Sequence, residues 1–454
     1  MDGLELIERF GIAAPFALMT RVLAQDFVGQ HLNGLFEEHR QAQYEYIATF
    51  SAVAMTVADV ALKFSDNFNQ AYKVHQHNLG VSIQSFYAKV NGVESPVSQA
   101  LVRESASRTV ALQDELEFHP WQIIPGYRCL AVDGNFLSKT DKRLGPLRAV
   151  AGAPLPGKVI ARFDLQRQVF DRAYLLEDAH HQEASTCGAM AADLQPQDVV
   201  IADRNFCVVP FLERIQACGA CFVIRQHGRL KGVLLGKRRF LGRTSTGRVY
   251  EQALQLSKEE GALIVRRITI ELDQPTRDKD TELHLLSNLP DTVEGLLIGE
   301  SYRQRWEEET AFQVLQMTLT CELASVGHPH AALFLFCISM TAYNLRQVLF
   351  AALYAEHEEQ EVLEVSHFHI SQDIANYTPG MLIAVRIAEW LEYIPTTIRG
   401  CGKLLRQIAA RIDLKKYRKA RRGAKKKKPF RSRNVPSKHV STAKQIKLPP
   451  QEHP

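Results

Sequence analysis

Tyr127-Arg128-Cys129-Leu130-Ala131-Val132-Asp133-Gly134 is an apolar run that ends in an acidic residue and a glycine. Such a run predicts a buried β-strand followed by a turn. The same pattern recurs in Asp198-Val199-Val200-Ile201-Ala202-Asp203, after a predicted helix over Glu183–Leu194. Strands that alternate with helices indicate an α/β sheet, and the carboxyl ends of its strands are where ligands gather. Asp133 and Asp203 are therefore the first candidate site residues.

Further strands and helices follow from the pattern on either side of these two runs. We expect strands around residues 147–154, 158–164 and 221–225, and a helix over 209–217. Strands that are first adjacent and then alternate with helices predict a mixed sheet. Residues 229–291 carry short strand-like runs, at 248–250, 262–270 and 283–289, with basic residues between them. We interpret that segment as a β-rich insertion.

The regions before and after this α/β core are predicted to be helical. Apolar residues recur at three- and four-residue spacing over 36–72, and later helices are expected over 293–319, 331–353 and 381–391. The apolar segment 331–353 contains Tyr343, Asn344, Arg346 and Gln347, so we interpret it as a buried core helix and expect no membrane span. The expected domains are a helical domain (1–118), the first part of the α/β core (119–228), the insertion (229–291), the second part of the core with C-terminal helices (292–412) and a basic flexible tail (413–454).

Charge is distributed unevenly along the 454 residues. Residues 414–447 hold 15 Lys and Arg and no Asp or Glu, whereas residues 1–413 carry 40 basic and 49 acidic residues, a net charge of −9. This asymmetry favours contact with a polyanion through local patches. The tail includes Lys425, Lys426, Lys427 and Lys428, which we expect to contact phosphates without reading sequence.

Cysteines and the amino terminus indicate an intracellular protein. The eight cysteines are scattered, as is typical of reduced thiols, and the Cys218–Cys221 pair lacks the other half of a zinc site. No basic stretch followed by an apolar run opens the chain, so we expect no secretory signal.

A second candidate site lies in the amino-terminal helical region. Residues 77–89 have the pattern of a helix-turn-helix, with Gly80 in the tight turn and Ser82 as the N-cap of the second helix. In that arrangement four polar residues would point outward to bases or phosphates: Ser82, Gln84, Ser85 and Lys89. An ordinary helical hairpin is the alternative.

A third acidic residue, Glu309, completes the candidate catalytic constellation. On a predicted helix, Tyr302, Arg305, Glu309, Phe312 and Gln316 form one stripe, while Glu307 and Glu308 are expected to point elsewhere. Three converging carboxylates repel one another unless a divalent cation is present, so Asp133, Asp203 and Glu309 indicate a site for Mg²⁺ or Mn²⁺. Two such ions can activate a water or a 3′-hydroxyl for phosphodiester attack. Each aspartate alone is more often a turn former.

The ordered set of motifs resembles the insertion-sequence DDE transposases with the YREK signature, Y-x2-R-x3-E-x6-K. The matching segments are 130–134, 201–206, 283–289 and the stretch from Tyr302 to Gln316. The resemblance implies an α/β fold with a ribonuclease-H-like mixed sheet and a β-rich insertion. It assigns Asp133, Asp203 and Glu309 as catalytic residues and ligands of two Mg²⁺ or Mn²⁺ ions, and Tyr302 and Arg305 as DNA-backbone contacts. Gln316 stands where the family has Lys, and this difference weakens the expected phosphate contact.

By the same resemblance, the protein cleaves double-stranded DNA at terminal inverted repeats and joins the freed ends to target DNA. A homodimer in the synaptic complex, a hairpin at the excised end and a bacterial, cytoplasmic, nucleoid-associated location are further expectations. Two alternatives stay open: a nuclease without strand transfer, and a catalytically silent DNA-binding regulator.

Two other features have less specific interpretations. His180-His181 with Glu183 is interpreted as a surface cluster at a helix entry rather than a metal site. Trp306 is interpreted as a packing anchor, with base stacking as the alternative.

Overall fold

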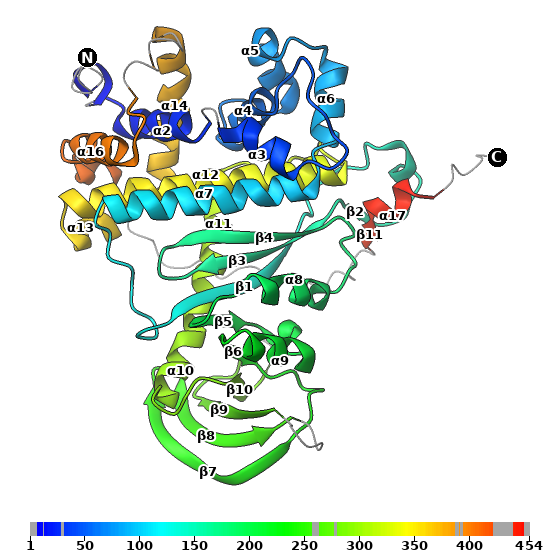
Figure 1. Cartoon of the computed structure of the whole chain (residues 1–454), viewed down its shortest axis with the longest axis vertical. Helices are drawn as coiled ribbons and strands as arrows, with labels where there is room; N and C mark the ends of the chain where they lie inside the picture. The colour runs from blue at the N-terminus through cyan, green and yellow to red at the C-terminus, as the bar shows by residue number, and fades with distance from the viewer. Residues whose placement is uncertain are drawn as a thin grey trace.

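The computed structural model describes residues 7–11, 13–28, 31–256, 263–276, 279–385, 390, 394–420 and 439–448. A nine-stranded mixed sheet runs through the molecule, with helices packed on its faces (Figure 1). Its strands are β1 (Arg128–Phe136), β3 (Lys158–Asp164), β4 (Val169–Leu176), β5 (Asp198–Ala202), β6 (Cys221–Arg225), β7 (Val233–Thr244), β8 (Gly247–Gln255), β9 (Ile264–Leu272) and β10 (Glu282–Ser287).

The sheet has the topology expected from the sequence. Its strand order is β4-β3-β1-β5-β6-β10-β9-β8-β7. Strands β1, β3 and β4 form an antiparallel meander, and β5 and β6 then add parallel to β1. This is a ribonuclease-H-like mixed sheet. The predicted strand over 221–225 and helix over 209–217 are both confirmed.

The helical elements precede, interrupt and follow the sheet. They are η1 (Ile7–Gly11), α2 (Pro15–Val28), α3 (His31–His39), α4 (Phe50–Ala61), α5 (Phe68–Leu79), α6 (Ile83–Asn91), α7 (Ser95–Glu115), η2 (Gly145–Leu147), η3 (Glu183–Thr186), α8 (Cys187–Ala192), η4 (Arg204–Phe206), α9 (Val209–Ala217), α10 (Gly295–Ser301), η5 (Tyr302–Arg305), α11 (Trp306–Thr318), α12 (Pro329–Glu356), α13 (Glu359–Leu363), α14 (His367–Ala384), α16 (Ile398–Ala409), η6 (Leu414–Tyr417) and α17 (Thr442–Ile446). The elements named η are short 3-10 helices, except η1, which is a π-helix.

The two faces of the sheet are covered by different helices. Along β1, Cys129 and Ala131 belong to the core shared with α7, α11 and α12, whereas Leu130 and Val132 belong to the core shared with α8 and α9. Because side chains alternate along a strand, Asp133 follows Cys129 and Ala131 onto the α11 face. This alternation decides which helix meets the first aspartate.

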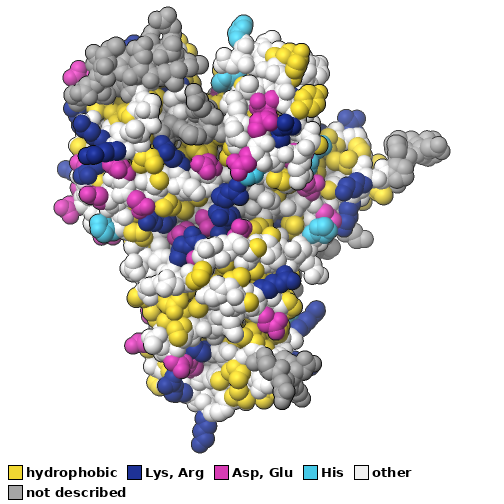
Figure 2. Space-filling model, viewed as in Figure 1, with side chains coloured by type: hydrophobic (Ala, Val, Ile, Leu, Met, Phe, Trp, Pro, Cys, Tyr) yellow, Lys and Arg dark blue, Asp and Glu magenta, His cyan; other side chains and the backbone are white. Residues whose placement is uncertain are grey.

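The surface carries both charge signs. In the view of Figure 2, Lys and Arg side chains are interspersed with Asp and Glu and with apolar side chains. No single basic field covers this face, which agrees with the mildly acidic composition of residues 1–413.

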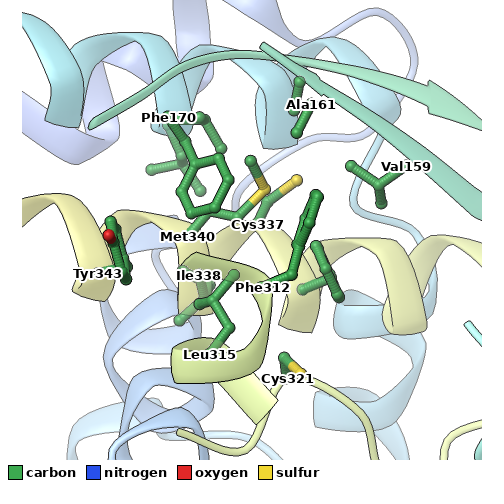
Figure 3. Packing of buried hydrophobic residues seen from close by; sticks show 14 of the residues in the cluster. Val159, Ala161, Phe170, Phe312, Leu315, Cys321, Cys337, Ile338, Met340 and Tyr343 are labelled. Atoms are coloured by element: carbon green, nitrogen blue, oxygen red, sulfur yellow. The ribbon is translucent and has the colours of Figure 1, made fainter. Parts of the chain in front are cut away.

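Helix α12 is a buried core helix. It is long and apolar enough to cross a membrane by length and composition, but 89% of its most apolar window is buried inside the protein. Figure 3 shows Cys337, Ile338 and Met340 of this helix packed with Phe312 and Leu315 of α11. Its polar members are used internally: Asn344 bonds to the backbone of Phe170 on β4 through both ends of its amide. The interpretation of segment 331–353 as core is confirmed.

The insertion extends the main sheet instead of forming a separate layer. Strand β10 pairs with β6, and β9, β8 and β7 follow in antiparallel order. Two strands differ from the sequence prediction. Strand β4 is additional to the predicted strands, and the strand expected over 147–154 is reduced to β2 (Ala153–Leu155), which lies in a second, two-stranded sheet.

The amino-terminal helices pack in two groups. Helix α2 packs with α14 and α16 from the carboxyl-terminal half, whereas α4 and α6 pack with α12. Helix α7 lies along α12 and against β4 (Figure 1). Packing thus crosses the boundary expected at residue 118.

The carboxyl-terminal segment is partly folded. Strand β11 (His439–Ser441) pairs with β2, and Lys444 of α17 lies 3.0 Å from Asp178. Residues 439–446, which lie within the segment expected to be a flexible tail, thus form a short strand and a short helix. Lys425, Lys426, Lys427 and Lys428 lie outside the described residues.

Candidate active site

Asp133 and Asp203 lie at the same edge of the sheet. Strands β1 and β5 are parallel neighbours, with Val132 opposite Ala202, so the residues that follow them are the two aspartates. At the other end of the pair, Arg128 on β1 donates two hydrogen bonds to the carboxylate of Asp198 on β5, at 2.8 and 2.9 Å. A bidentate arginine–carboxylate pair fixes this register, because its two parallel bonds tolerate little displacement.

Arg305 joins Asp133 to Glu309. Its Nη1 donates to Asp133 Oδ2 at 2.9 Å, and its Nη2 donates to Glu309 Oε1 at 2.8 Å. Arg305 ends the short helix η5, which packs on β1 and β5, and its residue is only 8% exposed. The guanidinium therefore occupies the space between a strand carboxylate and a helix carboxylate.

The carboxyl of Asp133 has an unusual environment. Burial raises the pKa of Asp133 to about 6, although Arg305 and the backbone N–H of Gly134 act in the opposite direction. The charges of Asp203 and Glu309 raise this pKa further, so all three carboxylates lie within electrostatic reach of one another. A perturbed carboxyl between two other acids is typical of a functional site.

Asp203 is held by its own turn. Its Oδ1 accepts a hydrogen bond from Asn205 N at 2.8 Å, and it caps η4. The Asn205 side chain in turn donates to Glu183 at 3.2 Å, and Lys158 lies 3.7 Å from the same glutamate. Glu183 thus supports the turn after the second aspartate.

Glu183 also lies against Gly134. A Cβ on Gly134 would lie 2.7 Å from Glu183 Oε1, so a larger residue there would displace the end of the glutamate side chain. Sequence reasoning singles out Glu183 only as part of a surface cluster with His180 and His181. Glu183 lies on η3, and it reaches Gly134 on β1 and Asn205 after β5 only because these elements pack together in the fold. Local sequence does not reveal that packing.

Comparison with known proteins agrees with this geometry. Residues 125–345 match the family model described as "Transposase DDE domain". This part of the chain is similar to transposase DDE domains. The match supports the identification of a DDE transposase, and it includes Asp133, Asp203 and Glu309.

Two other comparisons add little. No curated protein matches the chain. Among solved structures, the chain is similar to a piggyBac transposase synaptic complex with hairpin DNA, determined by cryo-electron microscopy, with 10% identity and a TM-score of 0.40 over 84% of this chain and 85% of that one. A likeness at that level carries no part of the argument that follows.

Helix α11, which carries Glu309, differs from its predicted orientation at one position. Glu308 is expected from the sequence to point away from the site, but it is completely buried and neither carboxylate oxygen has a partner at full hydrogen-bond geometry among the described residues. Burial raises the pKa of Glu308 well above its usual range, and the charge of Asp133 raises it further. Glu307 is exposed, as expected.

The other residues of the predicted stripe differ in how far they are exposed. Tyr302 is 9% exposed, with its ring centroid 5.9 Å from the Arg305 guanidinium carbon, so neither side chain presents a free surface. Gln316 is exposed. Trp306 is 58% exposed, so its interpretation as a packing anchor is wrong, because it begins α11 on the outward side.

Some residues at this edge of the sheet fit a divalent cation. Among the residues that the structure describes, no group of three or more His, Cys, Asp or Glu is already arranged to hold a metal ion. The guanidinium of Arg305 nevertheless shows that a positive charge is stable between Asp133 and Glu309. Carboxylate oxygens suit a hard cation such as Mg²⁺, which would neutralise charge on a phosphate and activate an attacking oxygen. Asp133, Asp203 and Glu309 are the residues that would hold it.

Other reactive groups and hollows lie apart from the three carboxylates. His181 is 63% exposed in its side chain and lies 3.7 Å from Asp178, as expected of a surface cluster, but Glu183 does not belong to that cluster because its side chain is only 12% exposed and accepts from Asn205. The seven cysteines outside α16 are free thiols. A groove of about 980 Å³ borders α11 at Glu307, Gln313 and Met317, but Asp133, Asp203 and Glu309 do not line it.

The predicted helix-turn-helix has the expected geometry. Helix α5 ends at Leu79, Gly80 is left-handed with φ +63°, and Ser82 caps α6 by accepting from Ser85 N. Ser82, Gln84 and Ser85 are exposed. Lys89 is half-buried: it donates to the carbonyl oxygen of Tyr44 and lies 5.0 Å from that ring's centroid. Three of the four predicted DNA-binding residues are thus free to meet a ligand in this conformation.

Proposed function

We propose that this protein is a cut-and-paste DNA transposase of the YREK-signature type. It would cleave DNA at the ends of its own element and transfer the freed ends to a target. The observation that supports the proposal best is the arrangement of Asp133 and Asp203 at adjacent parallel strand ends, with Glu309 bound to Asp133 through Arg305.

In this proposal the three carboxylates hold two Mg²⁺ or Mn²⁺ ions. The bound metal supplies charge neutralisation for the phosphodiester and lowers the pKa of the attacking water or 3′-hydroxyl. The chain's own residues orient that centre: the Arg128–Asp198 pair fixes the register of β1 and β5, and Glu183 supports the turn after Asp203. Arg305, when released from Asp133 and Glu309, would bind a DNA phosphate.

DNA contacts are assigned by the same proposal. Ser82, Gln84 and Ser85 on α6 would face the element end, and Lys425–Lys428 would contact phosphates. Exposed Trp306 would offer a stacking surface for a base. A homodimer at the synapsed terminal repeats, a hairpin at the excised end and a bacterial, nucleoid-associated location belong to the proposal as well.

The decisive experiment uses labelled DNA from both flanks of the gene, where the proposal predicts inverted repeats, with an unlabelled target plasmid and Mg²⁺. We expect joined products with the wild-type chain. Cuts without joining would indicate a nuclease, and a mobility shift without cleavage would indicate a silent regulator. The comparison with a silent regulator is needed because Gln316 replaces the lysine of the signature.

Matched variants test the assignment of the site. Asp203→Asn keeps an oxygen that can accept from Asn205 N, so the cap survives while the charge is removed. Glu309→Gln removes the charge on α11, and Glu307→Gln is its exposed neighbour. We expect cleavage to fall by at least about 100-fold in the first two variants and to be unchanged in the third, since general acid–base or metal-binding groups contribute at that scale. Wild-type cleavage by Asp203→Asn would refute the assignment.

A further inference from the structure

Glu308 is an acidic residue in an apolar row. The buried stripe of α11 consists of Glu308, Ala311, Phe312 and Leu315. Figure 3 shows Phe312 and Leu315 packed with α12 and with strand residues of the sheet. Because the other residues of this buried stripe are apolar, an apolar residue such as leucine or methionine is expected at position 308.

Burial of this carboxyl is compensated only in part. The backbone N–H of Asp133 and the charge of Arg305 act to lower its pKa, but burial outweighs them. The residue has no exposed area, and neither Oε1 nor Oε2 has a partner at full hydrogen-bond geometry among the described residues. A buried polar group without a partner destabilises a fold, and a buried charge does so more strongly. Glu308 therefore calls for a partner that this conformation lacks.

The neighbours of Glu308 indicate what that partner is. Asp133, Arg305 and Glu309 are the charged groups that act on it. Arg305 pairs with Asp133 and Glu309 but not with Glu308, and the Nε of Arg305 is itself buried without a partner among the described residues. Two carboxylates thus contact one guanidinium and a third carboxyl lies buried within electrostatic reach of it, so a group of higher positive charge would balance them better.

We propose that Glu308 is a fourth acidic residue of the metal centre, which binds a divalent cation together with Asp133 once Arg305 has moved aside. The proposal rests on the proposed function, because it takes the cation from that function. It assigns to the buried face of α11 a ligand that the YREK pattern does not contain. Glu309, which is 45% exposed in its side chain, then serves the solvent side of the same centre.

The test measures Mn²⁺ binding by the full chain without DNA and without turnover. Isothermal titration calorimetry gives the Mn²⁺ dissociation constant, and the melting temperature with and without Mn²⁺ gives an independent readout. The variants are Glu308→Gln, Glu309→Gln and, as the exposed control on the same turn, Glu307→Gln. We expect Glu308→Gln to weaken Mn²⁺ binding at least tenfold while melting without metal no lower than wild type, and Glu307→Gln to match wild type.

The outcomes separate this inference from the proposed function. Mn²⁺ binding by Glu308→Gln within twofold of wild type, with loss of binding in Glu309→Gln, would overturn the role of Glu308 alone. A wild-type chain that binds no Mn²⁺ in either readout would overturn both. If Glu308→Gln does not fold, Glu308→Met supplies the same comparison, because an apolar side chain of similar length suits the stripe. Tenfold weaker Mn²⁺ binding in a well-folded Glu308→Met would support the proposal.

Discussion

Arg305 is the side chain on which the charge balance of the site depends. Its guanidinium pairs with both Asp133 and Glu309, and it is almost fully buried. Removing one partner of a buried ion pair is costly, because it leaves the remaining charges uncompensated. The same guanidinium competes with any cation for the same oxygens.

We predict that Arg305→Gln lowers the metal-free stability by about 2 kcal/mol, less than a fully buried pair would lose because Glu309 is partly exposed. Mn²⁺ is expected to restore much of that stability, since it binds the folded state and now meets no competing guanidinium. Urea denaturation with and without Mn²⁺ measures both effects. Arg303→Gln, an exposed position on the same turn, is the control. Equal destabilisation with and without Mn²⁺ would contradict competition for one site.

At the scale of elements, the ends of β1 and β5 could be predicted from the sequence. Which residues of α11 face the sheet could not. The apolar runs before Asp133 and Asp203 specify strands by local pattern, and parallel neighbours bring their ends together. The predicted helical stripe assumes 3.6 residues per turn from Tyr302 onward, but residues 302–305 form a 3-10 helix. Its tighter turn changes the phase of α11, which brings Glu308 inward and leaves Glu309 at the edge.

The turn of the helix-turn-helix depends on Gly80. Its φ of +63° is left-handed, and a Cβ there would lie 3.0 Å from Ile47 Cγ2. We predict that Gly80→Ala costs about 1–2 kcal/mol, because an L-residue is strained in this region and the approach to Ile47 is tight. Gly34→Ala in α3 is the control: nothing lies within 4 Å of its added Cβ, so it should stabilise the protein by up to about 1 kcal/mol. Urea unfolding of both variants checks the pair, and equal stability would show that the turn is not strained.

Strand β10 carries a histidine that makes the insertion sensitive to acid. Burial lowers the pKa of His284 to about 4, and the charge of Arg267 lowers it further. Because this is below the usual value of 6.5, the unfolded chain binds the proton more tightly than the folded one. The contribution of neutral His284 to stability is thus complete above pH 6.5 and is lost as the pH falls toward 4.

We predict that His284→Gln removes this acid sensitivity and keeps an acceptor for Thr269 Oγ1, which lies 3.1 Å from His284 Nδ1. Between about pH 7 and pH 4, wild type should lose on the order of 2 kcal/mol more than the variant, since one pKa unit corresponds to about 1.4 kcal/mol. Melting temperatures across this range give the comparison. His119→Gln, at an exposed position, is the control and should follow wild type. Parallel curves for wild type and His284→Gln would show that His284 is not the sensitive group.

On the scale of the whole molecule, the pairing of distant segments is what sequence reasoning does not reveal. The pairing of β11 with β2 joins residues about 290 positions apart, and a three-residue strand in a basic segment has no pattern of its own. Similarly, α2 packs against α14 and α16, and a helix's apolar stripe shows that it has a partner without showing which. The ribonuclease-H-like sheet could be predicted because its strands are long apolar runs in a recognisable order.

The distribution of charge over the whole chain leads to the last prediction. Residues 1–413 carry a net charge of −9, and basic side chains are interspersed with acidic ones on the face in Figure 2. Long-range attraction to DNA must then come largely from residues 414–447.

We predict that replacing Lys425, Lys426, Lys427 and Lys428 by Gln lowers affinity for terminal repeats and unrelated DNA by the same factor. The slope of log affinity against log salt should fall by about 0.9 for each phosphate that the variant no longer neutralises. Fluorescence anisotropy over a salt series measures both quantities, and Lys415→Gln with Lys416→Gln shows whether position matters as well as charge. A selective fall in affinity for the terminal repeats would mean that these lysines read sequence, because lysines that bind phosphate alone strengthen binding to every DNA equally.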